Sequence, residues 1–300
     1  MITAPDGTMY RAADAHVHIY KEKIAAKASQ VIGDFYHADG YNFEMWEPDP
    51  APEVLLRKGK EIGIDRYAVF SAATAARQVD SINRFIADEC ARHPEFVGLG
   101  TAHPDAIDPT LPDGRDCEAL VEQIAALGLK GMKLHPDMQQ FNIDDPRMMP
   151  LYRAAAQAGL VVLFHVGDER HSFSDPVRLA RVLEEIPDLR CHAAHLGCCR
   201  IWDRRPVALA ASVLAGADIA FDTSSMLAWA PADDVRFIIG QLGIDRIMWA
   251  SDYPMWSPAE EFKLLLGLGY SSADNQRMLY DNFARFYRID DSIKNAVENA

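Results

Sequence analysis

The chain of 300 residues lacks any apolar run long enough to cross a bilayer. Its first residues carry neither a basic start nor an apolar stretch, so we expect no secretory signal. The five cysteines are an odd number without regular spacing, which predicts free thiols rather than a disulfide framework. Free thiols are typical of a reducing compartment, and we therefore expect a cytoplasmic protein.

Basic residues are also scarce, because 30 lysines and arginines face 44 acidic residues and the net charge is −14. This balance argues against a nucleic acid or an acidic membrane surface as partner. It is compatible with a small anionic substrate held by a few local arginines. The expected partner is thus a small molecule, and the sequence leaves a homo-oligomeric state open.

Hydrophobic residues make up 49% of the chain, enough to bury a large core. Eight apolar strands alternate with helices at a period of about thirty residues, the size of a βα unit. This pattern predicts an α/β protein, a single (β/α)₈ TIM barrel over residues 1–300 with an insertion after the first strand. A doubly wound sheet is the alternative, but no Gly-x-Gly-x-x-Gly turn follows any strand. Beyond the first strand near residue 16, strands are expected at 66–71, 96–102, 131–135, 160–166, 189–195, 219–223 and 246–251.

Residues 20–52 break this rhythm and carry several aromatic residues among glycines and aspartates. We expect a long insertion that folds over a pocket as a lid, because long loops in compact domains are often functional. In the alternative interpretation the aromatics only anchor a surface excursion to the body of the protein. The aromatics are Phe35, Tyr36, Tyr41, Phe43 and Trp46.

Polar residues follow most of the predicted strands. His16 and His18 lie two apart on the first strand, so they project to the same face and can reach one divalent ion. The alternative is a pair of structural histidines. The other candidates at strand ends are His103, Lys133, His135, His165, His195, Asp222, Thr223, Ser251 and Asp252. Active sites of such barrels lie at the carboxyl ends of the strands, which is where these residues are expected to gather.

Five motifs carry a family resemblance. They are Asp-Ala-His-Val-His, Gly-Met-Lys-Leu-His-Pro, Leu-Phe-His-Val-Gly, Ala-Ala-His-Leu-Gly and Ala-Ser-Asp-Tyr-Pro, and Asp-Asn-Phe-Ala-Arg-Phe-Tyr closes the series. From residue 14 to 287 the sequence resembles the amidohydrolase superfamily, in particular the amidohydrolase-2 branch. That branch includes enzymes similar to aminocarboxymuconate-semialdehyde decarboxylase, as well as hydrolases, hydratases and lactonases.

The resemblance implies one divalent metal, held by His16, His18, His165 and Asp252. Such a set of nitrogen and oxygen ligands suits Zn²⁺, with Mn²⁺ and Fe²⁺ as alternatives. His195 would act as the acid and base, and Asp252 would also accept a proton. Lys133 and His135 are additional site candidates, because binuclear relatives carbamylate a lysine at this place. A third alternative is a lactonase type without metal.

The implied function is a metal-dependent hydrolase that opens a lactone, amide or ester of a small carboxylic acid through a metal-activated water. The alternative is a non-oxidative decarboxylase of an aromatic or unsaturated acid on the same scaffold. A barrel that only binds a ligand is a third interpretation, disfavoured by the complete ligand set. Arg170, Arg200 and Trp256 are candidates for substrate binding, since guanidinium groups match carboxylates. Cys198 and Cys199 are interpreted as structural.

Overall fold

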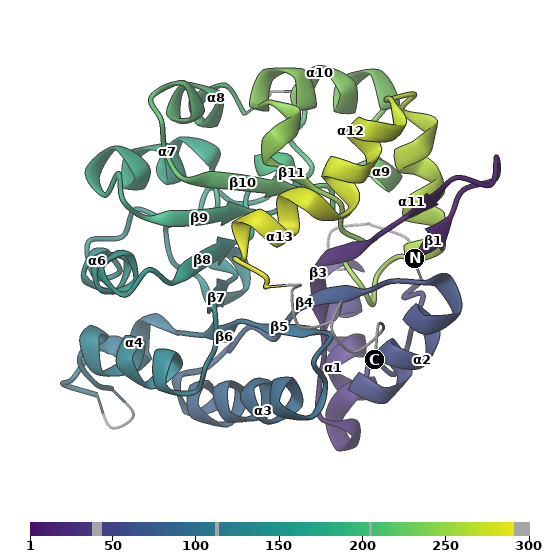
Figure 1. Cartoon of the computed structure of the whole chain (residues 1–300). Coiled ribbons are helices and arrows are strands. Elements are labelled where there is room, and N and C mark those ends of the chain that lie inside the picture. The colour runs from purple at the N-terminus through teal and green to yellow at the C-terminus, as the bar shows by residue number, and fades with distance from the viewer. Residues whose placement is uncertain (38–43, 112–113, 204–205, 291–300) are drawn as a thin grey trace.

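The computed structural model describes residues 1–37, 44–111, 114–203 and 206–290, so Tyr41 and Phe43 lie outside the described residues. A ring of parallel strands surrounded by helices dominates the architecture (Figure 1). The strands of the ring are β3 (Ala13–His18), β4 (Arg66–Phe70), β5 (Phe96–Gly98), β6 (Gly100–Thr101), β7 (Gly131–Leu134), β8 (Val161–Phe164), β9 (Arg190–Ala193), β10 (Ile219–Asp222) and β11 (Ile247–Met248).

The ring closes at two places where the regular ladders are interrupted. Leu99 alone separates β5 from β6, so these two short strands together fill one position of the barrel. At the other place, β3 meets the end of the eighth position through the backbone bond from Ala15 N to Trp249 O and the parallel bridge between Val17 and Tyr253. The predicted (β/α)₈ barrel is therefore confirmed, with every other neighbouring pair in the ring parallel.

Helices follow the strands, and most of them cover the outside of the ring (Figure 1). They are α1 (Glu22–His37), α2 (Pro52–Ile62), α3 (Val79–Arg92), α4 (Cys117–Ala126), α5 (Pro136–Gln139), α6 (Met149–Gln157), α7 (Pro176–Glu185), α8 (Val207–Leu214), α9 (Met226–Trp229), α10 (Ala232–Leu242), α11 (Pro258–Gly267), α12 (Ser272–Gln276) and α13 (Asn282–Phe286). Local chemistry explains their starts: at α7 the side chain of Asp175 accepts from Val177 N, with Pro176 in the first turn.

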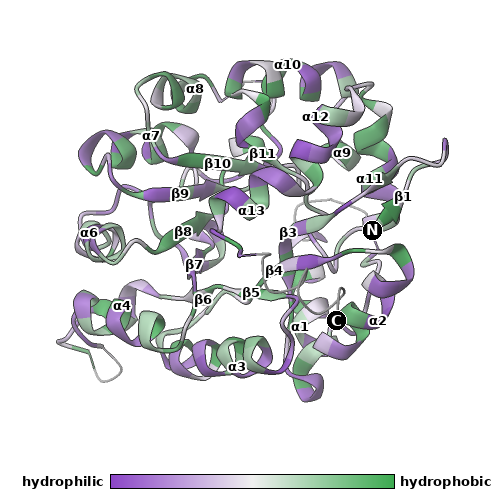
Figure 2. Ribbon diagram, in the orientation of Figure 1, coloured by the Kyte–Doolittle hydropathy of each residue, from purple (hydrophilic) through white to green (hydrophobic). Residues whose placement is uncertain are grey.

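The strands read as continuous apolar runs because both of their faces are buried. Val-Val-Leu-Phe in β8 is fully buried, and Figure 2 shows hydrophobic residues concentrated in strands such as β8 and β10. The centre of the ring is closed from the amino-terminal end by Tyr280, Phe283, Phe286 and Tyr287, which we call the aromatic plug. In Figure 1 the helix α13, which carries part of this plug, lies across the middle of the ring.

Three details differ from the expectations. A helix, α1, occupies much of the predicted insertion, and an antiparallel pair β1 (Ile2–Thr3) and β2 (Met9–Tyr10) precedes the barrel. The expected helix 272–286 is continuous but contains a π-helical turn, η5 (Arg277–Asp281). No helix within the described ranges has the length and apolar character that a membrane span requires.

Candidate metal centre and active site

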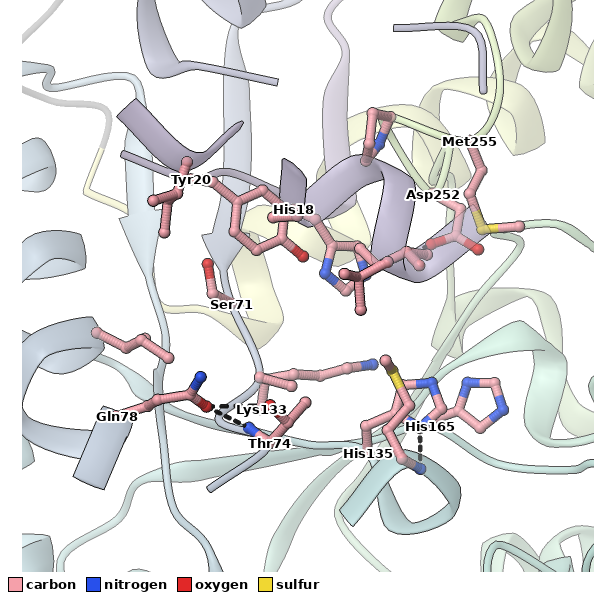
Figure 3. Close-up of a pocket in the computed structure, with 18 of the residues that line it drawn as sticks. His18, Tyr20, Ser71, Thr74, Gln78, Lys133, His135, His165, Asp252 and Met255 are labelled. Atoms are coloured by element: carbon pink, nitrogen blue, oxygen red, sulfur yellow. Dashed lines mark hydrogen bonds and ion pairs between the residues drawn. The ribbon is translucent and has the colours of Figure 1, made fainter. Parts of the chain in front are cut away.

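A cavity of about 490 Å³ opens at the carboxyl ends of the strands. Figure 3 shows His18, Asp252 and Met255 on one wall, and Lys133, His135 and His165 facing them across the cavity. These residues come from the ends of β3, β7 and β8 and from the loop after β11. The barrel thus gathers side chains from five of its strand positions into one site, and the chemistry-bearing residues among them are His16, His18, Lys133, His135, His165, His195 and Asp252.

His16, His18 and Asp252 form a group whose ligand atoms all lie within 4.8 Å of one another. Asp252 Oδ1 lies 3.4 Å from His16 Nε2 and 3.7 Å from His18 Nε2. Burial, followed by the charge of Lys133, holds the pKa of both imidazoles well below the usual value. Both rings therefore stay neutral near pH 7, which is the protonation state that a metal ligand needs.

Two observations test whether a metal fits here. His16 Nδ1 donates to Asp222 Oδ2 at 2.8 Å, which turns the lone pair of Nε2 toward the cavity. The buried Nδ1 of His18 has no hydrogen-bond partner within the described part of the chain, so no protein group commits this ring to a tautomer that would block Nε2, the nitrogen that faces Asp252. Two imidazole nitrogens and one carboxylate, buried and oriented in this way, fit a divalent ion.

His165 and His195 face one another on the adjoining wall, with 2.9 Å between His165 Nδ1 and His195 Nε2. The outer nitrogen of each ring is bound to a carbonyl oxygen, His165 Nε2 to Gly167 and His195 Nδ1 to Ser224. His195 Nδ1 also lies 2.8 Å from the Ser224 hydroxyl, so the imidazole tautomer decides which of the two inner nitrogens carries a proton. His165 Nδ1, whose ring partner Nε2 lies at a carbonyl oxygen, is the nitrogen of that ring that is left for a ligand role.

Asp222 is the residue that orients several of these groups. Its carboxylate accepts from His16 Nδ1, from the backbone N–H groups of His195 and Ser224, and from the Ser224 hydroxyl. Burial by itself would raise the pKa of Asp222, but its interactions with His16 and His192 outweigh burial and hold the pKa well below its usual value. A carboxylate that stays ionised fixes the imidazole tautomer on which metal binding depends.

Asp252 is also oriented by a hydrogen bond, which it accepts on the oxygen that points away from His16 and His18. Its Oδ2 accepts from the Ser225 hydroxyl at 2.5 Å, and that hydroxyl accepts from Trp256 Nε1 at 2.9 Å. Burial raises the pKa of Asp252, against the opposing influence of His195 and the Ser225 bond. His195, Ser225 and Asp252 also adopt left-handed backbone conformations, with φ of 59°, 60° and 58°. Such strained conformations in residues other than glycine are typical of functional sites.

Lys133 is a fully buried cation in the middle of the cavity. Its Nζ lies 3.4 Å from His16 Nε2 and 5.2 Å from the centre of the Phe70 ring. Burial lowers the pKa of this lysine to about 8, although Asp222 and Asp252 act in the opposite direction. His135 stacks on His165 with ring centres 4.1 Å apart, and Tyr36 Oη lies 3.4 Å from His135 Nε2. Both additional candidates of the sequence therefore line the cavity.

The predicted substrate-binding residues do not line this cavity. Arg170 is bound to both oxygens of Asp168 and covers the Phe35 ring at 4.5 Å, so it ties α1 to the loop after β8. Arg200 lies 4.5 Å from the centre of the Trp229 ring, and its Nη2 is 3.5 Å from Glu169. Trp256 lies outside the cavity lining and is connected to Asp252 indirectly, by donating a hydrogen bond to the Ser225 hydroxyl. Their role in substrate binding remains a prediction without support from the shape of the cavity.

Other sequence candidates are distributed between the site and the surface. His103 lies in a separate surface groove, where its Nδ1 accepts from Asp105 N, because the chain turns outward after β6. Cys199 is buried, and its sulfur groups with nitrogens of His165 and His195. Burial raises the pKa of its thiol well above the usual value, which fits the structural interpretation. All five cysteines are free, as predicted.

Sequence reasoning missed the serines and the buried His192. Ser224 and Ser225 stand two and three residues after the end of β10, so their place after a strand end was a usable signal. His192 lies inside β9, where its Nε2 is 2.9 Å from Asp222 Oδ2 and its Nδ1 is 2.7 Å from Tyr287 Oη. A histidine inside an apolar strand gives no hint that its ring reaches a carboxylate on the next strand.

Comparison with known proteins places this geometry in context. The family model described as amidohydrolase matches residues 13–289. A curated relative is the 2-amino-3-carboxymuconate-6-semialdehyde decarboxylase of Dictyostelium discoideum, which is 25% identical over 158 residues. These residues are 49% of this chain and 42% of the relative, so the match spans less than half of the relative's length.

Solved structures share the fold at low sequence identity. An uncharacterised TIM-barrel protein from Bordetella bronchiseptica has a TM-score of 0.72 and 18% identity, covering 93% of this chain and 98% of its own. A dihydroxybenzoic acid decarboxylase from Polaromonas sp. JS666, with bound manganese and the inhibitor 2-nitroresorcinol, has a TM-score of 0.66 and 15% identity. That match covers 93% of this chain and 97% of the other.

Proposed function

This chain belongs to the amidohydrolase family of enzymes, and on that premise we propose that it is a metal-dependent, non-oxidative decarboxylase of an aromatic or unsaturated carboxylic acid. The Dictyostelium relative and the Polaromonas structure are both decarboxylases by name. The sequence favoured hydrolysis and kept decarboxylation as the alternative. The relatives support that alternative better, and none of those described here is named as a lactonase, amidase or esterase.

The observation that carries the proposal is an imidazole that can transfer a proton and a cation in one buried cavity. His195 lines the cavity, with its Nδ1 at the Ser224 carbonyl oxygen and its Nε2 2.9 Å from His165 Nδ1. Lys133 brings a positive charge to within 3.4 Å of His16 Nε2. Decarboxylation needs both groups, since a carboxylate must be held and the carbon that loses it must gain a proton.

We propose that His16, His18 and Asp252, whose ligand atoms lie within 4.8 Å of one another, hold the divalent metal. His165 lies outside that group, and we propose that it joins as the fourth ligand when the metal binds. When bound, the ion would act as a Lewis acid that neutralises charge on substrate oxygens. Manganese becomes the first candidate because the Polaromonas decarboxylase binds it, and zinc and iron remain alternatives. The donor set of imidazoles and a carboxylate accepts all three ions.

In the proposed reaction, Lys133 orients the substrate carboxylate against the apolar wall of the cavity. The bond between the carboxylate and its carbon breaks, the electron pair stays on that carbon, and carbon dioxide leaves. His195 then gives the proton on Nε2 to the same carbon, so one proton is consumed for each carbon dioxide released. Ser224 and Asp222 keep the ring of His195 in the orientation that this transfer needs. General acid help of this kind is worth roughly 10²–10⁴-fold in rate.

Product analysis tests the proposal directly. Protein loaded with manganese is mixed with dihydroxybenzoic acids and with 2-amino-3-carboxymuconate-6-semialdehyde, and released carbon dioxide is measured with the decarboxylated product. We expect one carbon dioxide for each substrate consumed, released roughly 10²–10⁴-fold more slowly by the His195→Asn variant. Opening of lactones or esters with uptake of water, without carbon dioxide from any acid, would overturn the proposal in favour of the hydrolase.

A further inference from the structure

Helix α1 packs against the barrel mainly through small residues and exposes its large aliphatic residues to the cavity. The face that is buried against the body consists of Ala25, Ser29, Gly33 and Tyr36, three of them small. The large aliphatic residues are on the face that lines the cavity, as Ile24, Val31 and Ile32. Ile24 and Val31 are 50% and 49% exposed, although an amphipathic helix normally buries such residues in the core.

The aliphatic face of α1 forms a continuous strip along the cavity. Ile24, Ala28, Val31 and Ile32 follow the spacing i, i+4, i+7 and i+8, which puts them on one side of a helix. Eight residues at 1.5 Å each separate the first from the last, so the strip is about 12 Å long. Within the described residues no apolar element covers this strip, since it borders the open cavity.

The ends of α1 connect this strip to the site at one side and to α3 at the other. Tyr36, in the last turn, lies 3.4 Å from His135 Nε2, a residue of the site. At the beginning, Lys21 Nζ lies 5.8 Å from the centre of the Phe85 ring on α3. Ile82 and Phe85 line the same cavity from α3, so apolar side chains of two helices border it beyond the metal-binding residues.

The cavity extends beyond the metal-binding residues to side chains of α1 and α3. The whole cavity measures about 490 Å³, within the range of about 300–1,000 Å³ in which drug-sized ligands bind. The chemistry-bearing residues gather at one end, and Thr74 and Gln78 at the far end are hydrogen-bonded to each other (Figure 3). Those two polar groups are therefore committed to a local turn. Besides the polar Tyr20 and Ser71 (Figure 3), the lining of the cavity includes the apolar residues Ile24, Val31, Ile32, Ile82 and Phe85.

We infer that the strip on α1, together with Ile82 and Phe85, is a binding subsite for an extended apolar substituent on the carboxylic acid substrate. The inference rests on the proposed function and specifies its substrate class: an acid whose alkyl or aryl extension lies along α1 while its carboxylate reaches Lys133. Burial of the extension removes apolar surface of both ligand and helix from water, which is the source of the added affinity.

A ligand series tests the subsite by binding, independently of turnover. The probes are 2-hydroxybenzoates with methyl, propyl and pentyl groups at ring position 4, and a second series substituted at position 5, titrated calorimetrically into manganese-loaded protein. We expect affinity to rise about fourfold for each methylene group that leaves water, in at least one series. A change of less than twofold from methyl to pentyl in both series would overturn the inference.

Matched variants on α1 locate the effect. Ile24→Asp and Val31→Asp change half-exposed residues, so the fold should tolerate them, and we expect them to remove most of the gain from a longer chain. Ala26→Asp is the control, because Ala26 is exposed on the same helix and does not line the cavity. Equal losses in Ala26→Asp and Ile24→Asp would mean that general charge, rather than the strip, determines binding.

Carbon dioxide release in the same samples separates this inference from the proposed function. Affinity that rises with chain length while no acid releases carbon dioxide would retain the subsite and reject decarboxylation. The opposite result is carbon dioxide release with a rate and a binding affinity that do not change with chain length. It would support decarboxylation and reject the subsite.

Discussion

The two ends of the barrel bury side chains of opposite character, apolar at the amino-terminal end and ionisable at the carboxyl end. At the amino-terminal end, the aromatic plug packs against small and aliphatic strand residues such as Ala15 and Ala68. At the carboxyl end, the buried groups are His16, Lys133 and Asp252, which are charged or can become charged. The plug resembles an ordinary protein core, whereas the site keeps groups that are costly to bury.

This difference teaches where stability and function reside in the molecule. Burial of the plug removes apolar surface from water and stabilises the fold. Burial of the site groups shifts pKa values and needs compensation from neighbours such as Asp222. The two ends are nevertheless connected, because Tyr287 of the plug contacts His192, which in turn lies against Asp222.

The largest effect is expected from removing a metal ligand. His16→Ala should abolish activity and reduce bound metal from about one equivalent per chain to a small fraction, because the donor set loses an imidazole. Elemental analysis and turnover measured on the same sample check this. His103→Ala is the matched control, a buried histidine outside the cavity that should keep both metal and activity. Full metal retention in His16→Ala would contradict the assignment.

The second effect concerns the proton donor. His195→Asn should lower kcat by roughly 10²–10⁴-fold while metal content and melting temperature stay close to those of the wild type. Asp252→Asn, in contrast, should lose metal as well as activity. Steady-state kinetics with metal analysis distinguishes the two roles. They would be reversed if His195→Asn lost metal and Asp252→Asn kept it.

At the opposite end, the expected effect is on stability alone. Phe283→Ala removes a fully buried ring from the plug and should lower the free energy of unfolding by about 3–5 kcal/mol. Well below the melting temperature, kcat should remain unchanged because no site residue moves. Denaturant unfolding and kinetics check both points. Phe237→Ala, at a ring that is 47% exposed on α10, should change stability by less than about 0.5 kcal/mol.

The smallest effect tests the cost of burying an acid near the site. Glu261 on α11 is buried, and burial, with Asp252 and Asp14 as further contributors, raises the pKa of its carboxyl well above 4.5. The unfolded chain therefore releases this proton more readily, and the stability of the wild type falls as pH rises from about 4.5 through the folded pKa. Glu261→Gln lacks this titration.

The melting temperature of Glu261→Gln should therefore exceed that of the wild type by about 2–4 °C at pH 8. The difference should vanish near pH 4, where the wild-type carboxyl is protonated in both states. Thermal unfolding of both proteins across this pH range gives the answer. A difference that is constant with pH would show that altered packing, and not ionisation, is responsible.

The period of about thirty residues in the sequence was sufficient to predict the (β/α)₈ barrel. Every strand position of the ring coincides with an expected strand, because parallel strands buried on both faces leave a strong apolar signal. The helix within residues 20–52 was missed although Ile24, Ala28, Val31 and Ile32 are spaced as on one side of a helix. The glycines, aspartates and aromatics of residues 33–46 determined the interpretation of the whole segment as a loop. The antiparallel pair β1 and β2 is too short for its pattern to be recognised.

For the site, position at a strand end was informative, and contacts between distant residues were not. His165, His195 and Asp252 reach the cavity because barrel strands bring their carboxyl ends together. Arg170 occupies a comparable position, but Asp168, two residues earlier, captures its guanidinium. His103 misses the cavity because its strand ends at Thr101 and the chain turns away.

The sequence by itself determined the alternation of strands and helices and the set of ionisable residues at the strand ends. Only the tertiary structure decided which atom of each residue faces the cavity. The nitrogen of His16 that can bind a metal is selected by Asp222, a residue 206 positions away in the chain. The aliphatic face of α1 is likewise directed to the cavity by contacts with the barrel. Tautomers and helix orientation depend on partners that meet only when the ring closes, and a pattern along one chain does not contain them.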